Sequence, residues 1–121
     1  MRIGIDAMGG DFAPLEAVKG AIEAKEQMQD IVPVLFGQKD MILDCFKTLG
    51  IPENALEIVH AEEVIDMGEH ATKAIAHKKN SSINVAYRYL AEKKIDAFIG
   101  AGNTGAMLVG SIFSVKAIEG V

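Results

Sequence analysis

The chain has 121 residues, of which 50% are hydrophobic and 24% are charged, and its formal net charge is −5. These values suit one folded domain with a hydrophobic core and argue against an intrinsically disordered chain. The negative charge argues against a general nucleic-acid-binding protein, and no apolar run approaches the roughly 18 residues of a membrane span. The single cysteine, Cys45, excludes an internal disulfide and fits a reducing cytosol. The first residues, MRIGIDAM, are typical of a strand and lack the features of a signal peptide.

Segments typical of strands alternate along the chain with segments of helical periodicity. Strands are expected at 2–8, 31–37, 56–61 and 95–101. Helices are expected from Pro14, over 39–49, within 70–79, after an N-cap at 80–82, and over 104–118. The segment 39–49 has the clearest pattern, because its apolar side chains form one stripe and Gly50 follows as a stop signal. Cys45 lies on that stripe and is expected in the core.

This alternation predicts an α/β fold with a mostly parallel sheet and helices on both faces. Ligands of such folds bind outside the carboxyl ends of the strands. Two glycine-rich loops, at 9–11 and 100–105, are both expected there. No internal repeat or linker is evident, so residues 1–121 are expected to form one structural unit. The sequence stops without a clear terminal element, which suggests part of a larger domain.

The loop GAGNTG at 100–105 can bind an anion. Its glycines allow the backbone N–H groups to approach a ligand, and a helix beginning there adds the positive end of its dipole. Asn103 can donate through its amide and Thr104 through its hydroxyl. The alternative is an ordinary strand-to-helix turn in which Asn103 or Thr104 caps the helix. The loop also matches the dinucleotide fingerprint G-x-G-x-x-G, but it follows the fourth expected strand and not the first.

Two further stretches carry polar groups. In DAMGGDFAP, Asp6 and Asp11 flank Gly9 and Gly10, and the two carboxylates are expected to position the loop and not to face a bound anion. In HKKNSS, two lysines precede the hydroxyls of Ser81 and Ser82 at the start of a helix, which indicates a second anion site or, alternatively, a solvated basic patch before an N-cap. The histidines lack metal-ligand spacing, so no metal site is assigned.

Taken in order, the motifs IDAMGGDFAP, IVHAEEVIDM, KKNSS and GAGNTGAM closely resemble the bacterial phosphate acyltransferases of fatty-acid and phospholipid synthesis, the PlsX family. Members of that family are more than twice as long, so the resemblance covers an N-terminal part. It implies a Rossmann-like α/β/α sandwich similar to phosphate acetyltransferases. The chain departs from the family pattern at Phe12, where histidine is common. It also departs at Ala71, Ala76 and His77, where the family commonly has one proline and two arginines.

The resemblance implies transfer of a long acyl group from acyl carrier protein to inorganic phosphate, giving an acyl phosphate, with no cofactor. It further implies a cytoplasmic homodimer at the membrane surface, whose product is used by a membrane glycerol-3-phosphate acyltransferase. Lys79 and Asn103 are the expected catalytic residues. The expected phosphate-binding residues are Ser81, Ser82, Asn103, Thr104 and Gly105. Two alternatives stay open, namely a dinucleotide-dependent oxidoreductase and a non-catalytic phosphate-binding fragment.

Overall fold

Four parallel strands form one sheet in the order β3-β2-β1-β4. In this computed structural model, which describes residues 1–120, the strands are β1 (Arg2–Asp6), β2 (Val32–Gly37), β3 (Glu57–His60) and β4 (Ala97–Ile99). The register places Gly4 of β1 between Val34 of β2 and Phe98 of β4. Strand β1 therefore lies inside the sheet, with β2 and β3 on one side of it and β4 on the other.

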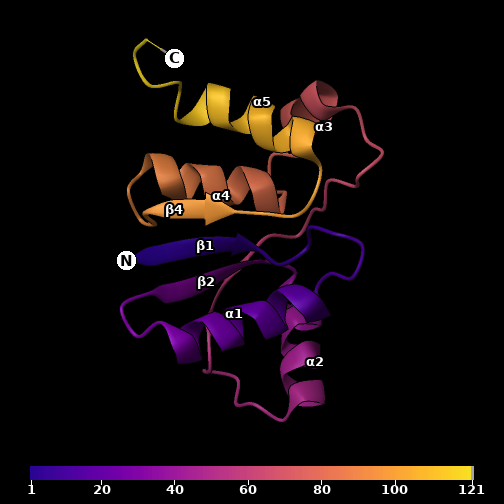
Figure 1. Cartoon of the computed structure of the whole chain (residues 1–121). Coiled ribbons are helices and arrows are strands. Elements are labelled where there is room, and N and C mark those ends of the chain that lie inside the picture. The colour runs from indigo at the N-terminus through magenta and orange to yellow at the C-terminus, as the bar shows by residue number, and fades with distance from the viewer. Residues whose placement is uncertain (121) are drawn as a thin grey trace.

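Helices cover both faces of this sheet. They are α1 (Leu15–Gln27), α2 (Lys39–Leu49), α3 (Ala71–His77), α4 (Ser82–Ala91) and α5 (Thr104–Ser114). Figure 1 shows α1 and α2 on one face and α3, α4 and α5 on the other. The predicted α/β fold, with a parallel sheet between two helical layers, is therefore confirmed as a Rossmann-like arrangement. Within residues 1–120, none of these helices has the length and apolarity needed to cross a bilayer.

The central strand β2 joins two separate parts of the core. Leu35 packs with Val18 of α1 and Phe46 of α2, whereas Val34 and Phe36 pack on the side of α4. This division follows from the period of two in a strand, which sends neighbouring side chains to opposite faces. Cys45 belongs to the α1–α2 side of the core, as the sequence predicts.

Predicted boundaries hold where a backbone signal marks the end of an element. Helix α2 covers the predicted 39–49, and Gly50 ends it in the left-handed conformation with φ of 69°. The first strand was predicted to reach residue 8 but ends at Asp6, because its carboxylate accepts the Met8 N–H at 3.0 Å. Helix α5 was predicted to reach residue 118 but ends at Ser114, and Lys116 adopts a left-handed φ of 63° although no glycine marks the stop.

Candidate functional site

The two glycine-rich loops meet at the carboxyl ends of β1 and β4. These neighbouring strands continue into opposite helical layers, β1 into α1 and β4 into α5 (Figure 1), which makes this edge the point where ligands of such sheets bind. A Cβ atom on Gly9 would lie 2.8 Å from the Gly102 backbone nitrogen, so the loops approach more closely than any side chain would allow. Gly10 has a φ of 97°, which also favours glycine. The predicted meeting of both loops at one edge is confirmed.

Asp6 lies beneath both loops, at the end of β1. Its side chain is 3% exposed, and its Oδ1 accepts the Met8 N–H at 3.0 Å. Burial raises the pKa of the Asp6 carboxyl, while the Ser82 hydroxyl and the N–H groups of Met8 and Gly9 favour the ionised form. The carboxylate therefore lies among the first loop, the start of α4 and the second glycine loop. These are contacts expected of a loop-positioning residue, and the role itself stays a prediction.

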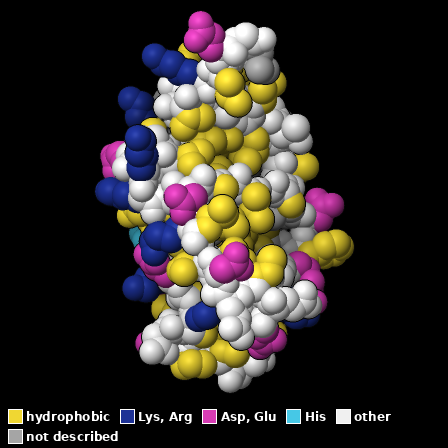
Figure 2. All heavy atoms as spheres, turned by 60° about the vertical axis from the view of Figure 1, so that its left-hand side comes forward, with side chains coloured by type: hydrophobic (Ala, Val, Ile, Leu, Met, Phe, Trp, Pro, Cys, Tyr) yellow, Lys and Arg dark blue, Asp and Glu magenta, His cyan; other side chains and the backbone are white. Residues whose placement is uncertain are grey.

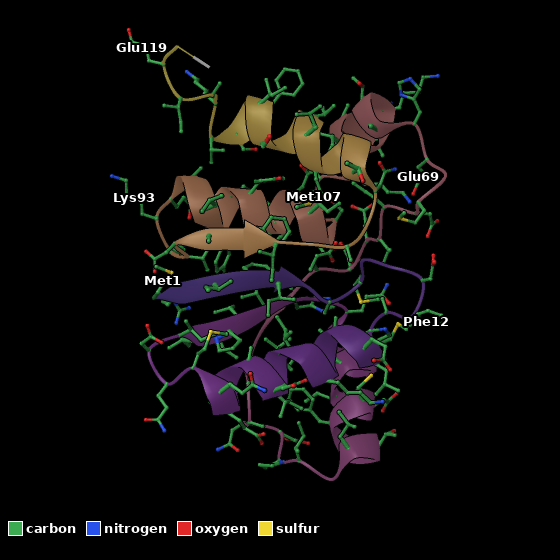
Figure 3. All side chains as sticks on the ribbon, viewed as in Figure 1. Met1, Phe12, Glu69, Lys93, Met107 and Glu119 are labelled. Carbon is green, nitrogen blue, oxygen red and sulfur yellow. The ribbon has the colours of Figure 1, made fainter. Side chains whose placement is uncertain are left out.

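Asp11 differs from Asp6 in its surroundings. It is exposed, and its carboxylate accepts no hydrogen bond from the residues that the structure describes. The neighbouring Phe12 is also exposed, at 76%. Figure 3 shows Phe12 projecting at the end of the molecule where the strands end, together with Glu69. The predicted loop-holding role of Asp11 therefore has no supporting contact within residues 1–120.

The two lysines of the segment before α4 have different surroundings. Lys78 is partly buried, and its Nζ donates to the Val64 carbonyl at 2.7 Å and to Glu69 Oε2 at 2.8 Å. That ammonium in turn lowers the pKa of the Glu69 carboxyl. Lys79 is exposed, and its side chain has no ion pair among the described residues. Of the two cations, Lys79 is therefore the one that could turn toward an incoming anion, whereas the positive charge of Lys78 is already balanced.

The two serines of this segment are buried at the start of α4. Ser81 Oγ accepts the Asn84 N–H at 3.2 Å, which confirms the predicted N-cap. Ser82 is 1% exposed, and its hydroxyl lies beside the Asp6 carboxylate. Both hydroxyls thus have protein partners in this structure. Their predicted contacts with phosphate stay predictions.

The Asn103 side chain makes more hydrogen bonds than any other side chain of the site. It caps α5, because its Oδ1 accepts the Ala106 N–H at 3.0 Å. Its Nδ2 donates to the backbone carbonyls of Asp66 at 3.1 Å, Met67 at 3.4 Å and Glu69 at 2.9 Å. The side chain is only 6% exposed. Direct donation from this amide to an anion stays a prediction, and it would require the amide to release these carbonyls.

The first turn of α5 offers N–H groups that need no such rearrangement. Thr104 and Gly105 occupy the first two positions of the helix, where an α-helix has no internal acceptor for its N–H groups. Thr104 is exposed, so its hydroxyl is accessible as well. Gly105 also packs against α3, since a Cβ atom there would lie 2.9 Å from the Cβ of Ala71. This helix start is the described position best suited to an anion.

Sequence reasoning missed the segment 64–69, which the structure brings beside the glycine loop. Asn103 holds this segment from the start of α5, and Lys78 holds it from the end of α3. The partners of Asn103 are 34 to 37 residues away along the chain. A local motif carries no signal of such a contact. The side chain of Asn84 in turn ties α4 to the end of α3, because its Nδ2 donates to the carbonyls of Ile75 and Lys78.

Comparison with known proteins places this chain in a family. The family model described as "Fatty acid synthesis protein" matches residues 1–121. The chain is 45% identical over 121 residues to the protein named phosphate acyltransferase of Dictyoglomus turgidum. It is 43% identical over 121 residues to that of Fusobacterium nucleatum, and 46% identical over 123 aligned residues to that of Caldicellulosiruptor bescii. Each match covers the whole chain but only 36% of the relative. The chain spans about a third of the length of these relatives, and it belongs to the fatty acid synthesis protein family of phosphate acyltransferases.

Proposed function

We propose that the full-length protein transfers a long acyl group from acyl carrier protein to inorganic phosphate. The main support is the similarity of the whole chain to proteins named phosphate acyltransferase. The described residues add a helix start with accessible N–H groups at the edge of the sheet where ligands bind. Such a site suits a phosphate group.

In the proposed reaction a phosphate oxygen attacks the thioester carbonyl of the acylated carrier protein. The new carbon–oxygen bond forms as the carbon–sulfur bond breaks, and the phosphate proton passes to the leaving thiolate. Because phosphate is itself the nucleophile, the reaction needs no Ser-His or Cys-His pair. It needs groups that position phosphate and fixed donors for the oxyanion that develops on the carbonyl.

The described residues can divide these tasks. The N–H groups of Thr104 and Gly105 and the Thr104 hydroxyl would hold phosphate, and Lys79 would supply positive charge. Asn103 would fix the start of α5 against residues 66–69, and Ser82 and Asp6 would fix the facing loop. The predicted direct roles of Ser81, Ser82 and Asn103 in binding phosphate are kept as part of the proposal.

The cellular location, the oligomeric state and the fate of the product that the family resemblance implies are also part of the proposal. The protein would work in the cytoplasm as a homodimer at the membrane surface, without a nucleic-acid partner. Its acyl phosphate would be consumed by a membrane glycerol-3-phosphate acyltransferase. Residues 1–121 would be the N-terminal part of one larger α/β domain.

The first prediction is that the full-length protein forms an acyl phosphate only when phosphate is present. We expect acyl carrier protein thioester plus phosphate to give a product that hydroxylamine traps as the hydroxamate, and sulfate in place of phosphate to give none. Millimolar phosphate should raise the melting temperature, because it binds the folded state. Turnover that does not depend on phosphate would contradict the proposal, and a melting shift with NAD or NADP would favour a dinucleotide enzyme.

Arg88 of α4 and Lys79 before it suggest where acyl carrier protein could dock. Carrier proteins are acidic, and this chain is acidic overall, so association would need a local basic surface. Arg88 Nη2 donates to the Lys79 carbonyl at 3.1 Å, which links Arg88 to the segment before α4 and to the site. Lys93 lies at the opposite end of the molecule from Phe12 and Glu69 (Figure 3). The surface formed by Lys79 and Arg88 therefore suits docking better than the lysine pair at 93–94.

The second prediction tests this surface by charge reversal. We expect Arg88→Glu to slow association of acyl carrier protein about tenfold or more at low salt and to flatten its salt dependence, because the steering charge is lost. Lys47→Glu makes the same change in net charge at an exposed position of α2, in the opposite helical layer, and serves as the control. Stopped-flow association measured at several salt concentrations reports both variants. Equal rates for the two variants would place the docking surface elsewhere.

A further inference from the structure

Helix α4 lies between the sheet and α5. Figure 1 shows α4 over β4 with α5 beyond it, and α4 contacts both of these elements. The glycine loop at 100–105 joins the end of β4 to the start of α5. The geometry of this loop therefore depends on how α4 holds the two elements that the loop connects.

One aromatic side chain of α4 contacts both elements. Tyr87 is 5% exposed, and its ring meets the Phe98 ring of β4 edge-on, with 5.2 Å between the ring centroids. Its Oη donates a hydrogen bond to the Met107 carbonyl of α5 at 2.7 Å. Figure 3 shows Met107 on the side of α5 that faces α4. Tyr87 thus ties the elements on both sides of the glycine loop to α4.

Helix α5 approaches the Tyr87 ring through a glycine. A Cβ atom on Gly110 would lie 2.7 Å from Cε2 and 2.8 Å from Cδ2 of Tyr87, which is closer than such atoms pack. A glycine inside a helix is destabilising relative to alanine. The close approach of the α5 backbone to the Tyr87 ring is what this glycine makes possible.

The opposite side of α5 is largely exposed in the part of the chain that the structure describes. Leu108 is 61% exposed, Ile112 is 52% exposed and Phe113 is 73% exposed. Figure 2 shows hydrophobic side chains gathered on the face of the molecule toward which α5 ends. Within residues 1–120, the position of α5 is therefore set by its inner side, which packs against α3 and α4.

Helix α4 also carries the facing part of the candidate site. Its first residue, Ser82, lies beside the Asp6 carboxylate. Tyr87 follows five residues later on the same helix, a rise of about 7.5 Å along the axis. Because a helix is stiff over this length, a movement of α5 against Tyr87 would move the N–H groups of Thr104 and Gly105 relative to Ser82.

We propose that Tyr87 is a positioning residue, which sets the place of α5 against α4 and so directs the first N–H groups of α5 toward the bound anion. In this role Tyr87 touches neither phosphate nor the thioester, and it acts through Phe98, Met107 and Gly110. The inference rests on the proposed phosphate site at the start of α5. The placement of α5 by Tyr87 can be tested without any ligand.

Substitutions at Tyr87 in the full-length protein test the proposal by phosphate binding, measured by titration calorimetry. We expect Tyr87→Leu to raise the dissociation constant for inorganic phosphate by about tenfold, because displaced N–H groups donate weaker hydrogen bonds to the ligand. Tyr87→Phe keeps the ring and lacks the hydroxyl, so we expect a smaller rise, of about threefold.

Tyr89→Leu is the matched control for Tyr87→Leu. Tyr89 lies on the same helix, and its ring packs edge-on against Phe36 of β2, also with 5.2 Å between the centroids. The control variant therefore loses an aromatic contact of the same kind, but with β2 and not with the elements that flank the glycine loop. It should lower the melting temperature and leave the dissociation constant for phosphate unchanged.

A double-mutant cycle with Gly110 tests whether the effect passes through the contact with α5. Gly110→Ala adds a methyl group where the Tyr87 ring lies, so it should also weaken phosphate binding by about tenfold. In the Tyr87→Leu background the same methyl group meets a shorter side chain, and it should change binding by less than about twofold. Additive effects, or unchanged phosphate binding in Gly110→Ala and in both Tyr87 variants, would overturn the proposal.

Hydrogen exchange without phosphate separates this proposal from the proposed function. The amides of Ala106 and Met107 donate to Asn103 at the start of α5. Relative to the amides of β2, they should exchange faster in Tyr87→Leu than in Tyr89→Leu, because the start of α5 is loosened locally. If the unmodified protein shows this difference but binds no phosphate, the phosphate site is wrong and the placement of α5 by Tyr87 stands. Equal relative exchange in the two variants would overturn that placement.

Discussion

Replacing Asn103 with alanine is expected to reduce phosphate-dependent acyl transfer in the full-length protein by about 10²-fold, the effect of a misplacement of about 1 Å in the groups that position a substrate. The structure gives the physical reason. The side chain holds the start of α5 through Ala106 and anchors residues 66–69 through the carbonyl of Glu69. Without it the N–H groups of Thr104 and Gly105 lose their fixed position. Loss of the cap alone should lower the free energy of unfolding by about 0.5–2 kcal/mol.

A second variant separates the cap from the tether. Asn103→Ser keeps an oxygen that can accept the Ala106 N–H, but it is too short to reach the carbonyls at 66–69. We therefore expect Asn103→Ser to recover most of the stability lost in Asn103→Ala and to stay slow in acyl transfer. The melting temperature, the turnover number and the KM for phosphate should be measured together. A destabilised Asn103→Ala variant with near-normal activity would reduce the loop to an ordinary turn.

The sequence was sufficient for those parts of the fold that depend on local signals. The stripe at 39–49 and Gly50 set the limits of α2, because the apolar period and a left-handed stop are both encoded within a few residues. Alternation of strands and helices predicted a parallel sheet, since parallel neighbours need helical crossovers. The glycine loops were expected at one edge for the same reason, and Gly9 and Gly102 do meet there.

The contacts that organise the site could not be predicted in this way. The strand order, with β1 between β2 and β4, depends on which apolar faces pack best and not on any local motif. Lys78 and Glu69 lie at opposite ends of α3, nine residues apart, and no local motif marks their pairing, so the basic stretch KK was equally compatible with a solvated patch. The tether from Asn103 to the carbonyl of Glu69 joins segments 34 residues apart. Only the structure shows that the Asn103 amide already donates to backbone carbonyls.

Asp6 provides the second large expected effect, because one buried carboxylate accepts hydrogen bonds from the first loop and lies against the second. Asp6→Ala leaves the Met8 N–H without its acceptor and opens a space beside Gly9 and Gly102. We expect a loss of about 1–3 kcal/mol in the free energy of unfolding from the orphaned donor. Acyl transfer should fall by up to about 10²-fold if the loops shift by about 1 Å. Asp11→Asn, at the exposed end of the same loop, is the control, and an equal loss in both variants would contradict a specific role for Asp6.

The pH dependence of stability gives an independent test of the same side chain. Burial raises the pKa of the Asp6 carboxyl above its ordinary value of 3.8, so the folded state binds this proton more tightly than the unfolded state does. As pH rises from 3.8 through the raised pKa, the folded state must give up that proton, and its stability falls. Asp6→Asn has no proton to release and keeps a carbonyl oxygen that can accept the Met8 N–H. The melting temperature of Asp6→Asn should therefore rise relative to that of the unmodified protein across this pH interval, and Asp11→Asn again supplies the control for net charge. If the difference in melting temperature between Asp6→Asn and the unmodified protein is the same at all pH values, the Asp6 carboxyl titrates alike in the folded and unfolded chains. Burial beneath the glycine loops would then not govern its ionisation.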